Sequence, residues 1–552
     1  MVSAASGLVE VMADSVNSGL CGDKQLVRTA MAAAVFALGV AVGDALAGRS
    51  EGRIAAAAVL GPSPALSTEP GTAAHAEPQH RRCLGMFARA YYPGRSGQIF
   101  LVPREGEVIA PGDSFYQLMH GSPWEYDTAI PLLFYGPGCI RAGEYTGKVG
   151  QQDVLPTLAA LLHLDTPSTV TGRVLRAALR ADAEVPAAVV VLVLDGARAD
   201  YFSHHAASMP YLDHLRRAGA WFAEAHIDYA PTNTAVGHTT ISTGSDPRIH
   251  GVVGNSIYDA VAGRKRKAYA GCSPRDLVVP ALADLWMAQG GGRAVVIAQG
   301  GNEPSATALA GHGACGSGGR PVRMASYRYS DADGGWTAGE GACFALSPPV
   351  RELHARALWA GAGSWMGHDI RGGKRLRHSA LFARFEGDAA VAAIAADSLG
   401  MDGVRGLVLV NLKTIDFVGH TYGPDSPEIV PALAAVDAQV GRIVAAVERK
   451  VGASGYVLAV TADHGMPAAP PARRHRSQEL VDSILARFDP SARRLLLSYE
   501  SEDSQLYFDA ERMRELGLAP ETVARYIETI PYIFAAYTEA EVREAAAELA
   551  GR

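Results

Sequence analysis

The sequence has few cysteines for its length, and they are not spaced as metal-binding cysteines usually are. Six occur in 552 residues, and no two of them form a Cys-x-x-Cys motif. This spacing excludes a cysteine zinc ribbon. The even number permits disulfide bonds in an oxidising compartment, but the sequence does not fix which cysteines pair. Small buried thiols are an equally good interpretation of most of them.

An excess of basic residues is also lacking. Lysine and arginine number 50 against 57 aspartates and glutamates, the formal net charge is -7, and no long basic stripe occurs. A protein that binds a nucleic-acid duplex is expected to carry such a stripe, so we expect no duplex partner. A small molecule is the expected substrate. The sequence gives no indication of the oligomeric state.

Long hydrophobic runs are absent except near the start of the chain. Residues 24–47 combine Lys24 and Arg28 with an apolar stretch over 30–42 and a small-residue Ala-Leu-Ala sequence. This layout is typical of a secretory signal, whereas Asp44 interrupts the run too early for a stable membrane span. If the segment is a signal, the protein is exported to the periplasm or outside the cell. If it is an ordinary alanine-rich helix, the protein is cytoplasmic.

Composition and periodicity divide the rest of the chain. Residues 49–82 are rich in Ala, Gly, Pro and Ser without periodicity, so residues 1–82 are interpreted as a signal-like segment followed by a disordered linker. Apolar runs of strand length then alternate with helical patterns, which predicts an α/β fold with a mostly parallel central sheet sandwiched by helices. The expected strands are 98–102, 132–135, 189–194, 294–298, 406–412 and 456–460, and the expected helices include 151–164, 209–218 and 427–449.

The stretch from about residue 256 to residue 395 differs from its surroundings. It is rich in Gly, Arg and Ser, and its hydrophobic periodicity is weaker. We interpret it as a cap inserted into the main domain, because loops that cover a site often have this character.

Three of the predicted strands end at motifs that carry acidic side chains. Asp195, Asp463 with His464, and Asp416 with His420 each follow one of the apolar runs. Ligands of open α/β sheets bind beyond the carboxyl ends of strands, and oxygen and imidazole groups suit zinc. One helical turn places Asp416 and His420 on the same face. A single strand-end aspartate often only caps a helix, but three such strand ends indicate a metal site.

A segment rich in hydroxyl groups, residues 230–255, reads APTNTAVGHTTISTGSDPRIHGVVGN. A threonine hydroxyl is a poor nucleophile at neutral pH and needs a base or a metal to activate it. Without metal ligands nearby, the cluster would be interpreted as a polar turn. His238 and His250 within the segment are interpreted as structural residues.

Taken together, the motifs D-G, P-T-x-T-x-x-x-H, G-N, D-x-x-G-H and D-H-G resemble the alkaline phosphatase superfamily, most closely its nucleotide pyrophosphatase/phosphodiesterase branch. The resemblance covers residues from about 84 to 545. It implies that Thr234 is the nucleophile and that Asn255 donates a hydrogen bond to the transferred phosphoryl group. It also implies two zinc ions, one held by Asp195, Asp463, His464 and the Thr234 oxygen, and the other by Asp416, His420 and one further histidine.

This resemblance implies a zinc-dependent phosphoester hydrolase that works through a phospho-threonine intermediate. Two metal ions about 4 Å apart can stabilise both apical oxygens of an in-line displacement. A sulfatase of the same fold would need a Cys or Ser in a C/S-x-P-x-R motif, and none occurs. A phosphoglycerate mutase would use a serine nucleophile with manganese. A non-catalytic binding protein that retains the fold is disfavoured, because a nucleophile and a full set of ligands are present.

One departure from the family pattern concerns the substrate. Dedicated monoesterases of the family carry a Lys-x-Arg pair just before an Ala-Gly-His sequence. In residues 298–313 both cations are missing, and Asn302 lies nearby. A phosphate dianion would lose a charge-assisted contact, which favours diesters, nucleotides or pyrophosphates, with alkaline phosphomonoesters as the alternative. The basic run 264–267 is interpreted as a solvated turn, and Lys413 as a residue that supports a neighbouring ligand.

The last zinc ligand poses a problem of order along the chain. The family normally places this histidine far downstream of the D-H-G motif, but the only histidine after His464 is His475. It comes too soon, and neighbouring arginines would repel a dication. Residues 91–175 instead resemble the end of these enzymes, and His120 falls on the missing position.

We therefore expect the chain to be circularly permuted. Residues 83–175 would be the displaced C-terminal part of the catalytic domain, 176–187 a linker between the old termini, and 188–552 the main catalytic domain. Such a rearrangement is physically tolerable because the two termini of a domain often lie close together at its surface. An assembly artefact that moved the segment is the alternative.

Overall fold

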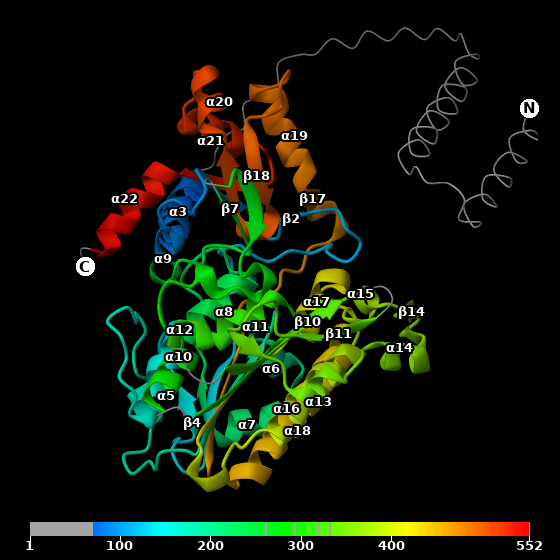
Figure 1. Ribbon diagram of the computed structural model, residues 1–552. Coiled ribbons are helices and arrows are strands. Elements are labelled where there is room, and N and C mark those ends of the chain that lie inside the picture. Colours follow the sequence, from blue (N-terminus) through cyan, green and yellow to red (C-terminus); the bar gives the residue numbers. More distant parts are fainter. Residues whose placement is uncertain (1–69, 260–261, 291–293, 318–320, 331–332, 551–552) are drawn as a thin grey trace, which may run out of the picture. The chain divides into compact units, whose positions relative to one another are not determined.

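A ten-stranded sheet forms the centre of the folded region (Figure 1). The computed structural model describes residues 70–259, 262–290, 294–317, 321–330 and 333–550. The signal-like segment at 24–47 and the first part of the expected linker lie outside the described residues. The strands run in the order β11 (Gly334–Thr337), β10 (Val322–Tyr329), β9 (Val295–Gly300), β15 (Gly406–Leu412), β5 (Ala188–Leu194), β16 (Tyr456–Thr461), β3 (Leu132–Tyr135), β6 (Ala220–Phe222) and β4 (Gly143–Tyr145), and β12 (Phe344–Ala345) pairs with β10.

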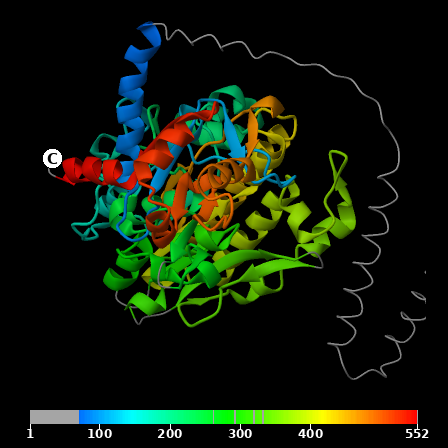
Figure 2. The ribbon, with the colours of Figure 1, turned by 90° about the horizontal axis from the view of Figure 1, so that it is seen from above.

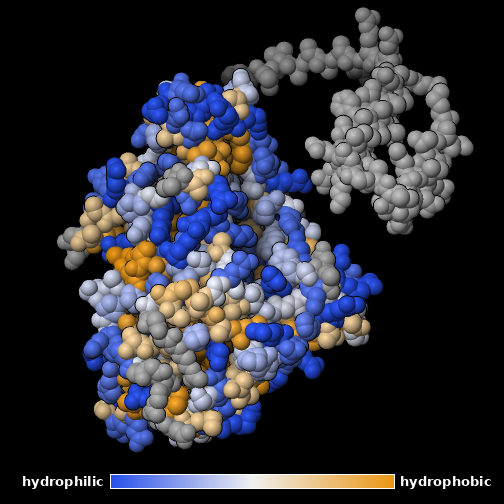
Figure 3. Space-filling model, in the orientation of Figure 1, coloured by the Kyte–Doolittle hydropathy of each residue, from blue (hydrophilic) through white to orange (hydrophobic). Residues whose placement is uncertain are grey.

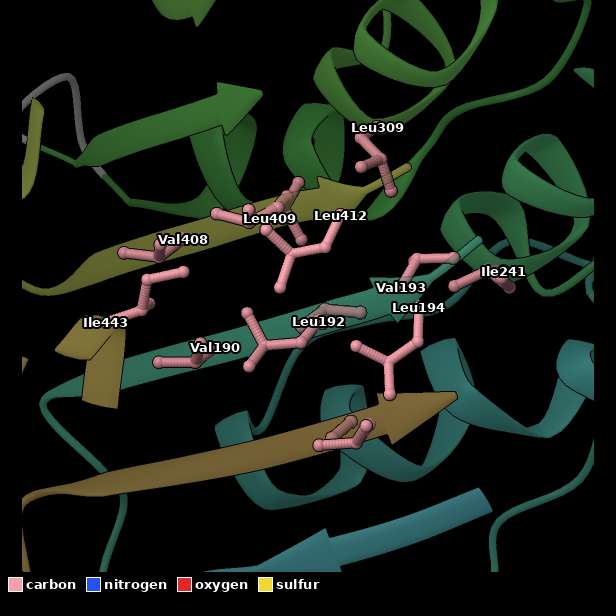
Figure 4. Packing of buried hydrophobic residues seen from close by; sticks show 14 of the residues in the cluster. Val190, Leu192, Val193, Leu194, Ile241, Leu309, Val408, Leu409, Leu412 and Ile443 are labelled. Atoms are coloured by element: carbon pink, nitrogen blue, oxygen red, sulfur yellow. The ribbon is translucent and has the colours of Figure 1, made fainter. Parts of the chain in front are cut away.

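The middle of this sheet is parallel. β10, β9, β15, β5 and β16 all run in one direction, whereas β11 and β3 are antiparallel to their neighbours. Every residue of β5 and β15 is buried. Because successive side chains of a strand point to opposite faces, this burial requires cover on both faces of the sheet. Figure 4 shows this packing around Leu192 and Leu412. The predicted α/β fold with a mostly parallel sheet is confirmed.

Two groups of helices pack on the sheet. One group comprises α5 (Val154–Leu162), α8 (Thr234–Thr243), α10 (Leu282–Gln289) and α11 (Glu303–Ala310), and the other comprises α7 (Pro210–Ala218), α16 (Leu381–Ala396) and α18 (Ile429–Val451). Among the described helices, α18 is long and apolar enough to cross a membrane by length and composition, but 56% of its apolar window is buried. It packs against α16 and β5, so it has the contacts of a core helix.

A smaller antiparallel sheet lies at one end of the folded region. Its order is β18 (Leu496–Glu500), β19 (Gln505–Phe508), β1 (Ile99–Pro103) and β20 (Ile533–Thr538). Alternate residues of β1 enter two separate cores: Ile99 and Leu101 pack with α19 (Ser477–Phe488) and α21 (Pro520–Glu528). Phe100 and Val102 pack with α3 (Pro70–Ala90) and α22 (Glu539–Ala550). Figures 1 and 2 show α3 and α22 together, although they stand at opposite ends of the described chain.

The structure corrects two of the expected boundaries. The linker predicted to run to residue 82 is wrong in its last part, since α3 begins at Pro70. Cys83, Met86 and Phe87 recur at helical spacing and are buried, and this apolar stripe outweighs the high content of Gly and Pro around it. The cap predicted at 256–395 is wrong in extent, because β9, β10, β11 and β12 are strands of the central sheet.

Shorter elements complete the described residues. They include α17 (Thr414–Tyr422), which follows β15. Two-stranded pairs are formed by β7 (Ser256–Asp259) with β8 (Arg264–Lys267), β2 (Val108–Ala110) with β17 (Arg474–Arg476), and β13 (Ser364–Trp365) with β14 (His368–Asp369). Short helices are α4 (Glu125–Thr128), α6 (Tyr201–His204), α9 (Pro247–His250), α12 (Ala314–Ser317), α13 (Pro348–Arg351), α14 (Arg356–Ala362), α15 (Gly373–Leu376) and α20 (Ala510–Glu515).

The cysteines of the described residues are either paired in a disulfide bond or free. Cys315 and Cys343 form a disulfide bond that joins α12 to the residue before β12. Cys83, Cys139 and Cys272 are free and buried. The sequence left both states open, and the structure contains both.

The surface visible in Figure 3 is mostly hydrophilic, with apolar side chains in small separate areas. Large hydrophobic side chains that are exposed in the described residues are scattered along the chain: Val278, Tyr329, Met366, Met401, Val430 and Leu497. Isolated exposed apolar residues are normal for a soluble surface.

Candidate metal centre

The acidic motifs meet at one edge of the central sheet. β15, β5 and β16 are neighbours and parallel, so their carboxyl ends lie side by side. Asp195 follows β5, Asp463 follows β16, and Asp416 lies in the first turn of α17 after β15. All three aspartates are at most 1% exposed. The strand order therefore places together carboxylates that are far apart in the sequence.

Asp195, Asp463 and His464 form the first group of ligand-type side chains. The Nε2 atom of His464 lies 3.5 Å from an oxygen of Asp195 and 3.3 Å from Oδ2 of Asp463. Burial and the adjacent carboxylate of Asp463 raise the pKa of Asp195 well above its usual range. This crowding of buried carboxylates would be relieved by a cation between them.

His120, Asp416 and His420 form the second group. The Nε2 atom of His420 lies 3.2 Å from Oδ1 of Asp416, and that of His120 lies 3.6 Å from the same oxygen. His475 lies elsewhere: it is on β17, its Nε2 is 2.8 Å from a carboxylate oxygen of Glu107, and its ring stacks on Tyr532. The structure thus brings His120, and not His475, beside Asp416 and His420.

The three imidazoles of the two groups are oriented in the same way. Nδ1 donates to a backbone carbonyl in each: His120 to Thr232 at 2.8 Å, His420 to Leu118 at 2.5 Å, and His464 to Gly465 at 2.8 Å. Such hydrogen bonds fix the tautomer and leave the Nε2 lone pair for a metal. Burial and the neighbouring histidines lower the pKa of His120 well below its usual range, so its neutral, ligating form is favoured.

The carboxylates fit the same purpose. Oδ1 of Asp416, which faces both His120 and His420, accepts no hydrogen bond from any described residue although it is buried. A buried carboxylate oxygen without a donor is costly. Burial acts to lower the pKa of His420, but the Asp416 carboxylate outweighs it and raises that pKa. A divalent ion would replace the proton that this pair attracts. Imidazole nitrogens with carboxylate oxygens are a donor set that suits zinc.

Thr234 is the first residue of α8, the helix that starts at this edge of the sheet. Its hydroxyl oxygen lies 3.4 Å from Nε2 of His464, and the residue as a whole is 3% exposed. Asn233 caps the helix by accepting a hydrogen bond from the backbone N–H of Val236 at 3.3 Å. The helix N-terminus therefore presents its partial positive charge beside the hydroxyl.

The first turns of α8 pass very close to the loop that carries Asp463. A Cβ atom built on Gly237 would lie 2.5 Å from the backbone oxygen of Asp463 and 2.7 Å from its Cβ atom. No side chain fits in that space. Glycine at this position lets the helix that begins at Thr234 and the loop that carries Asp463 touch.

Asn255 contacts the first turn of α8. Its Oδ1 atom accepts a hydrogen bond from the backbone N–H of Ala235 at 2.8 Å. Asp503 holds the segment in place by accepting from the backbone N–H groups of Asn255 at 2.6 Å and Ser256 at 3.0 Å. Since Oδ1 is used in this way, the NH₂ group of the amide is the end that is left to donate.

Lys413 lies inside the site, which its sequence position alone does not reveal. Its ammonium nitrogen is 2.7 Å from Oδ1 of Asp195, 2.9 Å from Oδ2 of Asp416 and 3.1 Å from the hydroxyl oxygen of Thr234. Burial acts to lower the pKa of Lys413, but the surrounding carboxylates outweigh it and raise that pKa above its usual value. The side chain is therefore a cation at neutral pH.

Other residues position the ligands, and sequence reasoning missed them. Asn411 donates to Oδ2 of Asp195 at 2.8 Å. Gln151 donates to the backbone oxygens of Ala462 at 2.7 Å and Asp463 at 2.8 Å. Asn411 stands in the same strand-end motif as Asp416, a signal that could have identified it. Nothing in the sequence around Gln151 indicates this contact.

His238 and His250, both interpreted as structural, are fully buried. Nδ1 of His238 lies 2.9 Å from the backbone oxygen of Thr234, one helical turn away, and 3.2 Å from Oδ2 of Asp463, so this histidine contacts the first group. His250 lies 3.1 Å from the hydroxyl of Thr240 and accepts from the backbone N–H of Val252 at 3.2 Å. The basic run 264–267, interpreted as a solvated turn, is instead strand β8, which pairs with β7, and its Lys265 pairs with Glu500.

The chain is similar to known phosphodiesterases and alkaline phosphatases. Residues 189–516 match the family described as type I phosphodiesterase / nucleotide pyrophosphatase. The chain is 26% identical over 383 residues to alkaline phosphatase PhoV of Synechococcus elongatus, covering 60% of this chain and 66% of that protein. It is 25% identical over 330 residues to alkaline phosphatase PafA of Elizabethkingia meningoseptica, covering 51% and 60%. The chain therefore spans less than two thirds of the length of these relatives.

A third relative is venom phosphodiesterase 2 of Crotalus adamanteus, which is 37% identical over 71 residues, 13% of this chain and 9% of that protein. Among solved structures, wild-type alkaline phosphatase PafA has a TM-score of 0.50 and 21% identity, covering 62% of this chain and 76% of that one. The structural similarity supports the fold. Because the family match spans more than half of the sequence, the chain belongs to the type I phosphodiesterase / nucleotide pyrophosphatase family, within the alkaline phosphatase superfamily.

Proposed function

We propose that this protein is a two-zinc phosphoester hydrolase with Thr234 as its nucleophile. The observation that carries the proposal is a buried hydroxyl, that of Thr234, 3.4 Å from His464 in one group of three ligand-type side chains. The second such group is its neighbour, since Nε2 of His464 lies 3.9 Å from Oδ1 of Asp416. The family membership and the names of the phosphatase and phosphodiesterase relatives support the same reaction class.

Asp195, Asp463 and His464 would hold one zinc ion, and His120, Asp416 and His420 the other. A bound pair of zinc ions supplies positive charge that favours ionisation of a hydroxyl or water and stabilises the entering and leaving oxygens. The hydroxyl oxygen of Thr234 attacks phosphorus, the bond to the ester oxygen breaks, and the alcohol leaves with a proton. Water then cleaves the phospho-threonine, which releases phosphate and regenerates the hydroxyl.

The remaining side chains orient the reacting groups. The NH₂ group of Asn255 donates to an oxygen of the phosphoryl group, where negative charge increases in the transition state. The N-terminal backbone N–H groups of α8 favour an anion at the same place. Backbone carbonyls hold the three imidazoles in their tautomers, so the ligands are in position before the substrate arrives.

We further propose that the protein is exported. The signal-like segment at 24–47 supports this, and so does the disulfide between Cys315 and Cys343, a bond that persists in oxidising compartments. A small soluble phosphoester is the proposed substrate.

The test combines metal analysis with one substitution. Purified protein is expected to contain two zinc ions per chain, to lose hydrolysis of an aryl phosphoester when the zinc is chelated, and to recover it when zinc is added. Thr234→Ala is expected to retain zinc and to lose about 10⁴-fold or more in kcat. Thr234→Ser, which keeps a hydroxyl, serves as the matched control and should retain measurable activity.

Full activity in Thr234→Ala would reject the nucleophile. Zinc binding without any turnover of either an aryl monoester or an aryl diester would instead support a non-catalytic binding protein that retains the fold.

A further inference from the structure

The residues that directly follow β9 carry no cation, so the Lys-x-Arg pair that the family resemblance implies for a monoesterase is missing here. Residues after this strand are Gly301, Asn302 and Glu303, and Asn302 caps α11 by accepting from the backbone N–H of Ser305 at 3.0 Å. The amide is therefore engaged with its own helix. The cation that this strand end lacks must come from elsewhere if the site is to bind a dianion.

The neighbouring strand supplies one. β9 pairs with β15, and Lys413 directly follows β15. A Cβ atom built on Gly301 would lie 2.6 Å from the Cβ atom of Lys413. The lysine thus occupies the space that a side chain at Gly301 would need, and the absence of one admits it to the site.

A buried carboxylate holds the backbone at Lys413. The backbone N–H of Lys413 donates to Oε1 of Glu386 at 2.7 Å, and the hydroxyl of Thr414 donates to Oε2 of the same carboxylate at 2.7 Å. Glu386 is fully buried and Lys413 is 3% exposed. A buried lysine on a fixed backbone is a positioned charge, unlike a solvated surface lysine.

The ammonium group points at the reacting atom. It lies 3.1 Å from the hydroxyl oxygen of Thr234. The non-bridging oxygens of a phosphorus atom bonded to that hydroxyl oxygen come within hydrogen-bond reach of the same nitrogen. Its other contacts, Asp195 and Asp416, are carboxylates of the proposed metal groups, so metal binding would weaken their attraction for the ammonium and leave it to the substrate.

Charge balance indicates which ester fits. While Thr234 keeps its hydroxyl proton, two divalent ions exceed the three carboxylates of the metal groups by one positive charge. Lys413 raises that excess to two, which matches a phosphomonoester dianion. A diester carries one negative charge, and the site without the lysine would already balance it.

We propose that Lys413 is a catalytic residue that binds the non-bridging oxygens of the phosphoryl group and makes phosphomonoester dianions the preferred substrates. The inference rests on the proposed function. It reverses the preference for diesters that the missing Lys-x-Arg pair predicts, because the lost charge is restored from the adjacent strand.

The test compares Lys413→Met with Lys450→Met, both zinc-loaded. Lys450, near the end of α18, is the matched control because it is a lysine that belongs to neither group of ligand-type side chains. Its ammonium donates to the backbone oxygens of Ala395 and Asp397. The measurements are kcat/KM for p-nitrophenyl phosphate and for bis-p-nitrophenyl phosphate, the zinc content, and the affinity for inorganic phosphate by calorimetry.

The wild-type protein is expected to prefer the monoester. Lys413→Met should lower kcat/KM for the monoester by about 100-fold or more, the effect of removing a preorganised donor, and lower it much less for the diester. It should retain both zinc ions and bind inorganic phosphate more weakly. Lys413→Arg, which keeps the charge, should recover part of the monoester rate, and Lys450→Met should match the wild type.

An equal loss for both esters in Lys413→Met, or an unchanged affinity for phosphate, would overturn the inference. So would a wild-type preference for the diester. These outcomes are separate from failure of the proposed function, in which the wild type hydrolyses neither ester or Thr234→Ala is fully active.

Discussion

Nδ1 of His120 donates a hydrogen bond to the backbone oxygen of Thr232, 2.8 Å away, across 112 residues of sequence. The contact ties the loop between β2 and α4 to the segment that leads into Thr234 and α8. It also turns Nε2 of His120 toward Asp416. This hydrogen bond therefore holds His120, which stands early in the sequence, beside Asp416 and His420, which stand late in it, and so completes the second group of ligand-type side chains.

The first prediction concerns this histidine. His120→Ala is expected to lose about one zinc ion per chain and to lower kcat/KM by more than about 100-fold. Removing a metal ligand should lower activity more than removing a residue that only hydrogen-bonds to a ligand, which costs about 10- to 100-fold. His475→Ala, which removes a histidine bound to Glu107, is the control and should keep both zinc ions. The measurements are zinc analysis and steady-state kinetics. The opposite result in the two variants would remove His120 from the site.

The second prediction concerns Asn255. Asn255→Ala is expected to lower kcat by about 10²- to 10³-fold, because it removes a preorganised donor to the phosphoryl group. Zinc content should be unchanged, since Asn255 belongs to neither metal group. A variant that loses zinc, or that changes only KM, would show that the amide merely supports the start of α8.

The third prediction concerns the order of the segments, for which we propose circular permutation. β1 lies between β19 and β20, and β3 pairs with β16, so residues 83–175 complete sheets built largely from later residues. The family match begins at residue 189 and leaves His120 outside it.

A rearranged gene that encodes residues 188–552 followed by 70–175, so that α3 stays whole, is therefore expected to give an active protein with the same zinc content. The new junction would lie between α22 and α3, which pack together. The control is a rearrangement opened inside β5, which should not fold. Loss of folding in the first protein, judged by circular dichroism and zinc content, would contradict the proposed permutation.

The fourth prediction concerns acid sensitivity. Burial, with a smaller effect of Arg95, lowers the pKa of His250 from 6.5 to about 3. The unfolded chain therefore binds a proton below about pH 6.5 that the folded chain does not bind until about pH 3. The stabilising contribution is fully present above pH 6.5 and is lost as the pH falls through this window.

His250→Gln should remove this proton linkage. Between pH 6 and pH 4, the free energy of unfolding of the wild type should fall by about 1.4 kcal/mol per pH unit more than that of the variant. Denaturant unfolding at matched zinc concentrations measures the difference. Parallel pH dependences in the two proteins would show that His250 is protonated in the folded state.

The fifth prediction concerns the disulfide. Protein denatured without reductant should expose two fewer reactive thiols than the same protein denatured with reductant, because Cys315 and Cys343 are paired. Cys315→Ser is expected to destabilise the fold by about 3 kcal/mol, as the loop closed by the bond spans 28 residues. Cys139→Ser, which changes a free thiol, should leave the thiol difference intact. Equal numbers of reactive thiols with and without reductant would count against the bond and against export.

The centre of the fold could be predicted because its signal is local. The expected strand at 189–194 is β5, one residue longer at its start, and the expected strand at 406–412 coincides with β15. Strands buried on both faces read as continuous apolar runs. Asp195 and Asp416 could be singled out for the same reason, because each follows such a run.

The rest depends on contacts that no local pattern records. β10 mixes exposed and buried positions and is held by β9 on one side and by β11 on the other, so its residues look like those of a loop. In the sequence, Lys413 is interpreted as a residue that supports a neighbouring ligand. Its 3.1 Å contact with Thr234 depends on the tertiary fold, which brings the residue after β15 to the first residue of α8. Asp503 and Gln151 are tertiary partners whose neighbours in sequence carry no motif.

The place of β1 in the small sheet has a consequence for how the protein is made. Ile99 pairs with Thr538, and Phe100 with Tyr537. Of the described strands, the first to leave the ribosome therefore pairs with the last one, β20. At about 5–20 residues per second, the early segment waits tens of seconds for that partner. During this time its apolar residues have no sheet to join, and a chaperone that shields the nascent chain would have its longest task there.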